Sequence, residues 1–249
     1  MDQGYKYIPN FLTEDELRDI ERVCDTFHSQ WLKENEEFYK NRAINSAYLT
    51  HSNKCSPQDR MVLFELIGSC KIRDELKSIF IKEDPAFLNT QLFFDPFNKS
   101  QENYWHRDIQ YTDHSIEEQK LALENSVNNV VHFRLALKNE NGIELIPGSH
   151  ARWDTDQEFK TRMALDGSKP SDDLENGQKI SLNRGDLLIF SANMIHRGLY
   201  GRERKALDIL YCERDREILK FANKECMPTK DELNSISFQE LFYLNENLG

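Results

Sequence analysis

Three side chains of the sequence have the types and spacing to hold one metal ion, and two of them are close together. His106 and Asp108 stand two residues apart, so on an extended segment both side chains would leave the same face. An imidazole and a carboxylate placed in this way can share one cation. A His-x-Asp pair is common in unrelated sequences, so the pair alone carries little weight.

A third ligand follows much later in the chain. His196 lies 90 residues after His106, within the stretch Asn193 to Gly198, and a turn with an apolar run precedes it at Asn183 to Phe190. A barrel of several strands requires a separation of this size. Two histidines and one carboxylate on one face of an octahedral ion leave positions open for other ligands, which is typical of non-haem iron(II) oxygenases.

The elements that would position these residues change in type along the chain. Helical patterns occupy Thr13 to Phe27, Ser29 to Tyr39 and Pro57 to Phe80. After Pro85 short strands separated by turns are indicated, and helical spacing returns beyond Glu213. The expected strands are Phe87 to Phe94, Val130 to Leu137, Gly142 to Ile146, Lys179 to Leu182, Asp186 to Phe190 and Ala206 to Cys212.

The order of these elements predicts one mainly β domain, a sandwich or barrel with flanking helices and not a parallel βαβ sheet. Within its 249 residues we expect a helical N-terminal part over about 1–84, a β core over about 85–212 and a helical cover over 213–249. Two polar stretches, Asp113 to Asn129 and Trp153 to Asn176, interrupt the core. They are interpreted as surface insertions, which either cover a binding mouth or are solvated decoration.

The composition argues against several classes of partner. A net charge of −11 disfavours non-specific binding to nucleic acid or to an anionic membrane, because phosphates would be repelled on average. The apolar stretches are too short to cross a bilayer and the first residues do not begin a signal peptide, so we expect a cytoplasmic protein. Its five cysteines form no CxxC pair and are expected to be reduced. The helical segments at the two ends of the chain could equally cap the β core or form a dimer surface, so no oligomeric state is predicted.

Four stretches of the chain resemble the phytanoyl-CoA dioxygenase family, in the order in which that family has them. Together they span most of the sequence and run over Gly4 to Leu17, Trp105 to Asp108, Asn141 to His150, and Gly185 to Leu207. The Pro-Gly-Ser-His element that ends at His150 is the most family-specific of them. The resemblance implies a double-stranded β-helix core, which is a jelly roll of the cupin-like kind, with an N-terminal helical layer.

The resemblance also implies roles for single residues. His106, Asp108 and His196 would bind Fe(II), and Arg204 would bind the distal carboxylate of the cosubstrate 2-oxoglutarate, with O2 as the other cosubstrate. A guanidinium grips a carboxylate in bidentate fashion and stays charged in a pocket, which suits this role. Arg202 is the less favoured alternative, because Arg204 better matches the strand after the loop. Related iron halogenases lack the carboxylate, so Asp108 points to hydroxylation or a related oxidation.

Four further residues are candidates for completing the site. By the resemblance, Gln91 would help to hold the cosubstrate, and Trp105 beside the metal ligands could shape a substrate pocket. His132 and Arg134 alternate on an expected strand, whose inward face the sequence does not fix. Arg134 would either hold an acidic substrate group or form a salt bridge. His132 fits a buried supporting histidine better than a metal ligand, and both are candidate substrate residues.

These residues together predict an iron(II)- and 2-oxoglutarate-dependent dioxygenase. It would hydroxylate a C–H bond of a small polar metabolite and release succinate and carbon dioxide. An acyl-CoA is disfavoured, because the acidic chain has no basic cluster to receive its phosphates. The alternatives are a metal-binding β-helix protein without turnover, and a cupin-like enzyme that uses another divalent metal. Only the oxygenase gives Arg204 a role.

Overall fold

Two antiparallel sheets form the centre of the computed structural model, which describes residues 1–81, 84–125 and 129–242. The strands are β1 (Tyr5–Ile8), β2 (Asn45–Ala47), β3 (Pro85–Phe94), β4 (Val130–Ala136), β5 (Glu140–Leu145), β6 (Gln178–Leu182), β7 (Leu187–Ser191), β8 (His196–Gly198) and β9 (Lys205–Glu213). The large sheet has the order β1-β7-β4-β9-β3-β2, and the small sheet has the order β6-β5-β8. Such a pair of sheets confirms the predicted jelly-roll architecture.

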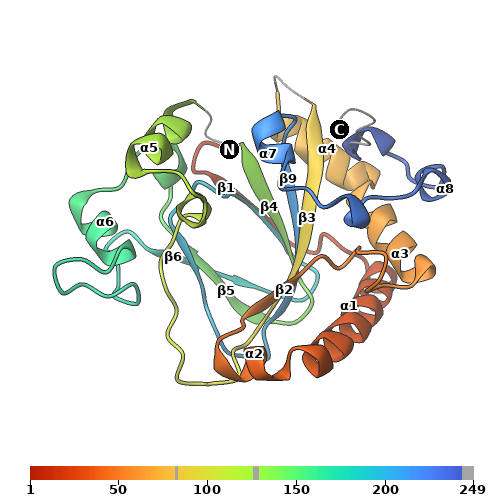
Figure 1. The fold of residues 1–249 in the computed structure, drawn as a ribbon, viewed down its shortest axis with the longest axis horizontal. Helices are drawn as coiled ribbons and strands as arrows, with labels where there is room; N and C mark the ends of the chain where they lie inside the picture. The colour runs from red at the N-terminus through yellow and green to blue at the C-terminus, as the bar shows by residue number, and fades with distance from the viewer. Residues whose placement is uncertain (82–83, 126–128, 243–249) are drawn as a thin grey trace.

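Helices flank the two sheets. They are α1 (Glu14–Glu34), α2 (Glu36–Asn41), α3 (Pro57–Ile67), α4 (Cys70–Ile79), α5 (Ile116–Asn125), α6 (Asp156–Arg162), α7 (Arg216–Leu219) and α8 (Lys230–Leu233), with 3₁₀ turns η1 (Asp108–Tyr111), η2 (Ser149–Ala151), η3 (Lys224–Cys226) and η4 (Gln239–Leu241). Figure 1 shows α1, α3, α4 and α8 on one side of the sheets, and α5 and α6 on the other side. The helical layers therefore enclose the strands from two directions.

The first helix is longer than the sequence predicted. It begins at a capping box, in which the Thr13 side chain accepts a hydrogen bond from the Glu16 amide. It then continues past the predicted end at Phe27 to Glu34, because the apolar face repeats at Trp31, four residues further on. The helix predicted over Ser29 to Tyr39 is thus divided between α1 and the short α2.

The helix predicted over Pro57 to Phe80 is also wrong as a single element. Gly68 ends α3, and the Ser69 side chain caps the next helix by accepting from the Ile72 amide. The predicted C-terminal cover consists, within the described residues, only of short helices and 3₁₀ turns. The sequence patterns did not reveal β1, β2 and β8, which have four residues or fewer each.

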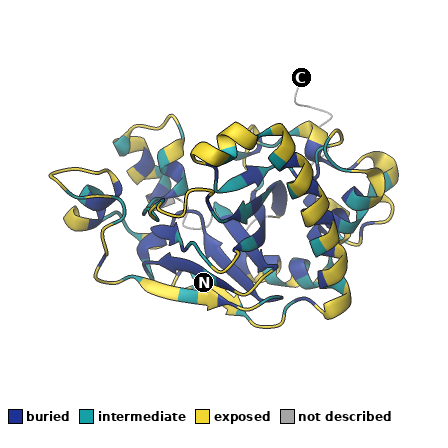
Figure 2. Ribbon diagram, turned by 90° about the horizontal axis from the view of Figure 1, so that it is seen from below, coloured by how far each residue is buried: buried dark blue, intermediate teal, exposed yellow. Residues whose placement is uncertain are grey.

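Both faces of the large sheet are buried, and the packing of β4 shows which of its side chains point to each face. Val131 and Phe133 pack toward the helices in the main hydrophobic core. His132 and Arg134 alternate with them, and so face the small sheet. Figure 2 shows buried strands inside helices whose outer faces are exposed. The space between the sheets is therefore lined partly by polar side chains, which is unusual for a core.

The five cysteines are all free. Burial raises the pKa of the Cys212 thiol to about 12 and that of Cys226 to about 11, so both stay protonated and unreactive at neutral pH. Over the described ranges, no helix combines the length and the apolar character that a membrane span needs.

Candidate metal and cosubstrate site

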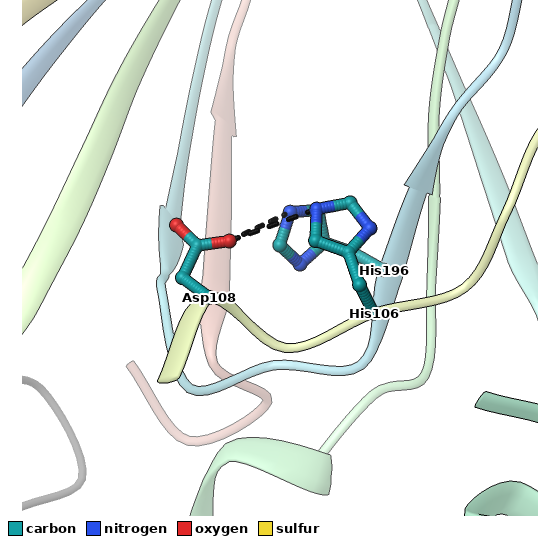
Figure 3. Close-up of side chains that lie close together, drawn as sticks. All are labelled: His106, Asp108 and His196. Carbon is teal, nitrogen blue, oxygen red and sulfur yellow. Dashed lines mark ion pairs between the residues drawn. The ribbon is translucent and has the colours of Figure 1, made fainter. Parts of the chain in front are cut away.

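His106, Asp108 and His196 come together between the two sheets (Figure 3). One ligand atom from each residue lies within 4.8 Å of the others. Asp108 Oδ1 is 3.6 Å from Nε2 of His106 and also 3.6 Å from Nε2 of His196. Three donors at this spacing can bind one divalent ion from one side and leave its other side open for further ligands.

The backbone fixes the two histidines to each other. The His106 amide donates to the His196 carbonyl at 3.0 Å, and the His196 amide donates back at 2.9 Å, which forms a β-bridge. The sequence predicted that Asp108 lies on an extended segment, and this is wrong, because Asp108 begins the 3₁₀ turn η1. Its amide donates to the Ala192 carbonyl at 3.3 Å. The turn nevertheless directs its carboxylate toward both imidazoles.

Hydrogen bonds prepare both imidazoles for metal binding. Nδ1 of His106 lies 3.2 Å from the Tyr104 carbonyl, and Nδ1 of His196 lies 3.0 Å from the Met194 carbonyl. A carbonyl only accepts, so each Nδ1 carries the proton and each Nε2 has a free lone pair. Burial lowers the pKa of His196 to about 3 and also lowers the pKa of His106. Both rings are therefore neutral, which is the form that binds metals.

The carboxylate of Asp108 is held from behind by His132. His132 Nε2 is 2.8 Å from Asp108 Oδ2, its Nδ1 is 3.2 Å from Asp208 Oδ2, and its ring stacks on Phe190 at 4.6 Å. Burial opposes a charge on His132, but the two carboxylates raise its pKa to about 10. Burial likewise opposes a charge on Asp108, yet His132 holds the pKa of Asp108 far below its usual value.

His132 consequently has no ring nitrogen left for a substrate or a metal. These contacts fit the buried supporting histidine that the sequence favoured, while the ring also lines the cavity, so its contact with a substrate stays a prediction. Its contacts leave Oδ1 of Asp108 as the oxygen that faces His106 and His196. Such outer partners fix the orientation of metal ligands.

Arg204 is a buried cation without a partner of opposite charge at hydrogen-bonding distance. Arg204 is 3% exposed, and its Nε and Nη1 have no hydrogen-bond partner in the described part of the chain. Glu140 is 3.8 Å from Nε and already forms a bidentate pair with Arg134. Burial, together with the charge of Arg134, lowers the pKa of Arg204 to about 10, so it stays charged at neutral pH. A buried guanidinium whose nitrogens lack hydrogen-bond partners is costly, which indicates a place for a further anion.

The surroundings of Arg204 are shaped to its guanidinium. The guanidinium carbon lies 5.2 Å from the ring centre of Phe93 and 5.6 Å from that of Tyr200. A Cβ added at Gly198 would be 2.4 Å from Arg204 Nη2, so no larger residue fits there unless Arg204 moves. The alternative anchor, Arg202, lies at an exposed position.

One cavity of about 310 Å³ contains all of these groups, between the two sheets. The three candidate metal ligands and Arg204 line the same space, which is large enough for a small dicarboxylate beside an ion. Gln91 also lines it, as its predicted role requires. The other lining residues are Ile44, Asn45, Phe93, Tyr104, Tyr111, His132, Arg134, Ile143, Phe190, Gly198, Tyr200 and Asp208.

Two of the candidate substrate residues have structural roles instead. Trp105 is completely buried, and its indole donates to the Asp172 carbonyl at 2.9 Å, so the prediction that it shapes the pocket is wrong. Neighbouring side chains of an extended segment leave opposite faces, and Trp105 points away from the cavity that His106 lines. Arg134 lines the cavity but forms the salt bridge with Glu140 at 2.8 Å, which decides between its two predicted roles.

Sequence reasoning did not single out several residues that line the cavity, among them Tyr104 and Asp208. Tyr104 stands two residues before His106, so the period of an extended segment could have placed it on the same side. Asp208 lies on β9 directly opposite Arg134 of β4, so the two side chains share a face of the sheet. Alternation could therefore have indicated Tyr104, whereas the place of Asp208 depends on the register between β4 and β9.

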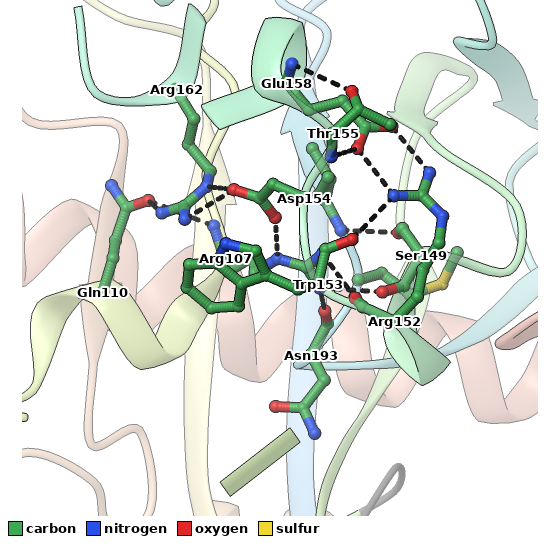
Figure 4. A network of polar contacts seen from close by, with 12 residues as sticks. Arg107, Gln110, Ser149, Arg152, Trp153, Asp154, Thr155, Glu158, Arg162 and Asn193 are labelled. Carbon is green, nitrogen blue, oxygen red and sulfur yellow. Dashed lines mark hydrogen bonds and ion pairs between the residues drawn. The ribbon is translucent and has the colours of Figure 1, made fainter. Parts of the chain in front are cut away.

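A network of buried charges anchors the loop that carries the ligands (Figure 4). Arg107, between the two ligands in sequence, is completely buried and donates to Asp154 at 2.7 Å and to the Asn193 carbonyl. Asp154 also accepts from Arg162 at 2.7 Å. These bonds tie the first part of the stretch Trp153 to Asn176 to the ligand loop, so solvated decoration is wrong for that part.

The comparisons with known proteins point to one family. Residues 1–200 match the sequence model of the phytanoyl-CoA dioxygenase family (PhyH). No curated protein matches the sequence. The matching range holds the three residues that meet at the candidate metal site and ends before Arg204.

Several solved structures share the fold. AviO1 from Streptomyces viridochromogenes Tue57 is 15% identical with a TM-score of 0.56, covering 86% of this chain and 91% of its own. The non-haem α-ketoglutarate-dependent carbocyclase SnoK from nogalamycin biosynthesis is 16% identical with a TM-score of 0.55, covering 86% and 81%. EctD from S. alaskensis, with 2-oxoglutarate and 5-hydroxyectoine, is 13% identical with a TM-score of 0.55, covering 85% and 73%. At these identities the likeness shows the fold.

Proposed function

The chain belongs to the phytanoyl-CoA dioxygenase family and is an iron(II)- and 2-oxoglutarate-dependent oxygenase, and from this premise we propose which residues perform the reaction and on what kind of substrate. His106, Asp108 and His196 hold the iron, and Arg204 binds the distal carboxylate of 2-oxoglutarate. The substrate is a small polar metabolite, which is hydroxylated at a C–H bond. The cofactors predicted from the sequence, Fe(II), 2-oxoglutarate and O2, are those of the family.

The observation that carries this assignment is the buried guanidinium of Arg204. It lines the same cavity as the three converging ligands, and two of its nitrogens lack partners. A dicarboxylate that reaches from the iron to Arg204 supplies the missing partner. Neither alternative function, a metal-binding protein without turnover or a cupin-like enzyme with another metal, explains why a buried guanidinium leaves two of its nitrogens without hydrogen-bond partners.

The donor set also fits iron(II). Two neutral imidazoles with free Nε2 atoms and one charged carboxylate form the set of two histidines and one carboxylate that binds non-haem iron. When bound, iron(II) together with 2-oxoglutarate and O2 supplies an oxidant for C–H bonds and releases succinate and carbon dioxide.

The protein's own residues bind, orient and shield. His132 keeps the outer oxygen of Asp108 occupied, which favours binding of the ion through Oδ1 alone and leaves other positions open. Arg204 fixes the far end of the cosubstrate, and Gln91 is placed to contact it in the same cavity. The buried network of Arg107 and Asp154 keeps the ligand loop in place.

The choice of a small substrate rests on size and charge. The cavity of about 310 Å³ is of a size for small molecules, and the net charge of −11 opposes an acyl-CoA with its phosphates. We also infer that the protein acts in the cytoplasm, and its five free cysteines are in keeping with a reducing compartment.

The assignment of Arg204 is tested by replacing it with lysine. Arg204→Lys keeps the charge but loses the bidentate grip, so the KM for 2-oxoglutarate in succinate formation should rise by about 10- to 100-fold. The matched control is Arg202→Lys, two residues away and exposed, which should leave this KM unchanged. An equal effect of both variants, or an effect of Arg202→Lys alone, would reject Arg204 as the anchor.

A further inference from the structure

A second hollow adjoins the metal site on the side of Asp108. It has a volume of about 570 Å³ and shares Asp108 with the cosubstrate cavity. Another hollow of about 460 Å³ continues it past Asp108 and Thr112 to Asp113. We call these two hollows together the outer groove. In Figure 1, α5 and α7, which contribute to it, lie at the same end of the sheets.

The outer groove has an apolar floor. Leu88 and Leu210, on neighbouring strands, and Ile109 beside the metal ligand are each 9% exposed or less. At the edge stands Phe221, whose large aromatic ring is 55% exposed. Ala122, Val130, Ala192 and Ile218 complete the apolar lining. Such a surface binds the hydrocarbon part of a small molecule, because apolar area is then removed from water.

The rim of the outer groove is negative. Besides Asp108, its carboxylates are Asp113, Glu118, Glu213, Asp215 and Glu217. Lys220 is the only lysine or arginine among the described lining residues, and its Nζ is 2.7 Å from Glu217 Oε2, so its charge is matched. Asp215 and Glu118 accept hydrogen bonds from backbone amides, which orient these carboxylates without removing their charge.

The charge of this rim is opposite to that of the cosubstrate end. The dicarboxylate cosubstrate meets a buried cation, Arg204, whereas a molecule that enters by the outer groove meets carboxylates. An anion would be repelled there and a cation attracted, and the effect falls as salt screens it. The two hollows that share Asp108 therefore favour ligands of opposite charge.

We propose that the outer groove binds the substrate, and that the substrate is a small organic amine with an apolar body, held by the acidic rim and laid on the apolar floor beside Asp108. This inference rests on the proposed function, because the groove is a substrate site only if Asp108 holds the iron. It narrows the substrate from a small polar metabolite to a cationic one.

The test compares three probes that share an eight-carbon chain, which are n-octylamine, 1-octanol and octanoate. Protein loaded with iron(II) and 2-oxoglutarate under argon is first checked for its metal-to-ligand charge-transfer band. Each probe is then titrated in by calorimetry. Octylamine should bind at least about tenfold more tightly than octanoate, with octanol between them, and the preference should shrink as ionic strength rises.

A double variant tests whether the rim is the cause. Asp113→Asn with Glu217→Gln removes two negative charges, and should lower the preference for octylamine over octanoate by about threefold or more. The control is Glu175→Gln, an exposed carboxylate that does not line the groove and should have no effect.

The outcomes separate the two claims. A charge-transfer band with equal binding of the probes, with no binding, or with a preference that the double variant leaves unchanged would overturn the amine proposal while the oxygenase stands. An amine preference in protein that gives no band would overturn the groove as a substrate site, and the failure would then belong to the metal assignment.

Discussion

His132 supports Asp108 without touching the metal, and its replacement tests how much this support contributes. The Nε2 bond to Asp108 at 2.8 Å is a hydrogen bond between charged groups, a class that contributes about 1.5–3 kcal/mol. Since about 1.4 kcal/mol equals a factor of ten, its loss from Asp108 should weaken iron(II) binding by about 10- to 100-fold.

Two variants grade the effect. His132→Phe keeps a ring against Phe190 but offers no donor, so it should show the full loss of affinity. His132→Gln retains one amide donor and should recover part of it. His150→Gln is the control for loss of a buried imidazole, because His150 is 3% exposed and does not line the cavity.

The assay is an anaerobic competition for iron(II) against a coloured chelator, with circular dichroism to show that each variant is folded. His132→Phe also leaves Asp208 without its partner, so some loss of thermal stability is expected in addition. If the folded phenylalanine variant binds iron(II) as tightly as the wild type, His132 does not position Asp108 and the reasoning is refuted.

Three further predictions follow from single contacts. Gly198→Ala places a Cβ 2.4 Å from Arg204 Nη2, so the KM for 2-oxoglutarate should rise by about tenfold, and an unchanged KM would contradict the fit. Arg107→Met leaves buried Asp154 with one partner fewer, and urea unfolding should show a loss of about 3–5 kcal/mol, whereas a loss below about 1 kcal/mol would refute the role of the network. Burial lowers the pKa of His28 from 6.5 to about 4, so between these pH values unfolding takes up a proton and the free energy of unfolding falls as the pH drops. His28→Phe should reduce this fall, and an unchanged dependence of the free energy of unfolding on pH would contradict the prediction.

Chemistry was easier to predict from this sequence than packing. His106, Asp108 and His196 were candidates because a metal requires these side-chain types, and the resemblance to the dioxygenase family gave them their roles and added Arg204 as the anchor of a dicarboxylate. The structure brings all four to one cavity.

The faces of strands and the partners of buried charges were not predictable in the same way. The alternation of side chains along a strand showed that His132 and Arg134 share a face of β4. Only the packing of Phe133 against the helices shows that this face is the one toward the small sheet. The pairing of Arg134 with Glu140 depends on the strand that follows in the other sheet. Trp105 was misjudged because nearness in sequence to a ligand was taken for nearness in space.

The central claim is that the two histidines and Asp108 bind iron and present it to 2-oxoglutarate. It is tested most directly by anaerobic titration of the apoprotein with iron(II) and 2-oxoglutarate, with His106→Ala alongside. We expect a visible metal-to-ligand charge-transfer band in the wild type that is lost in His106→Ala. No band in folded wild-type protein at saturating iron(II) and cosubstrate, or an equal band in the variant, would contradict the account.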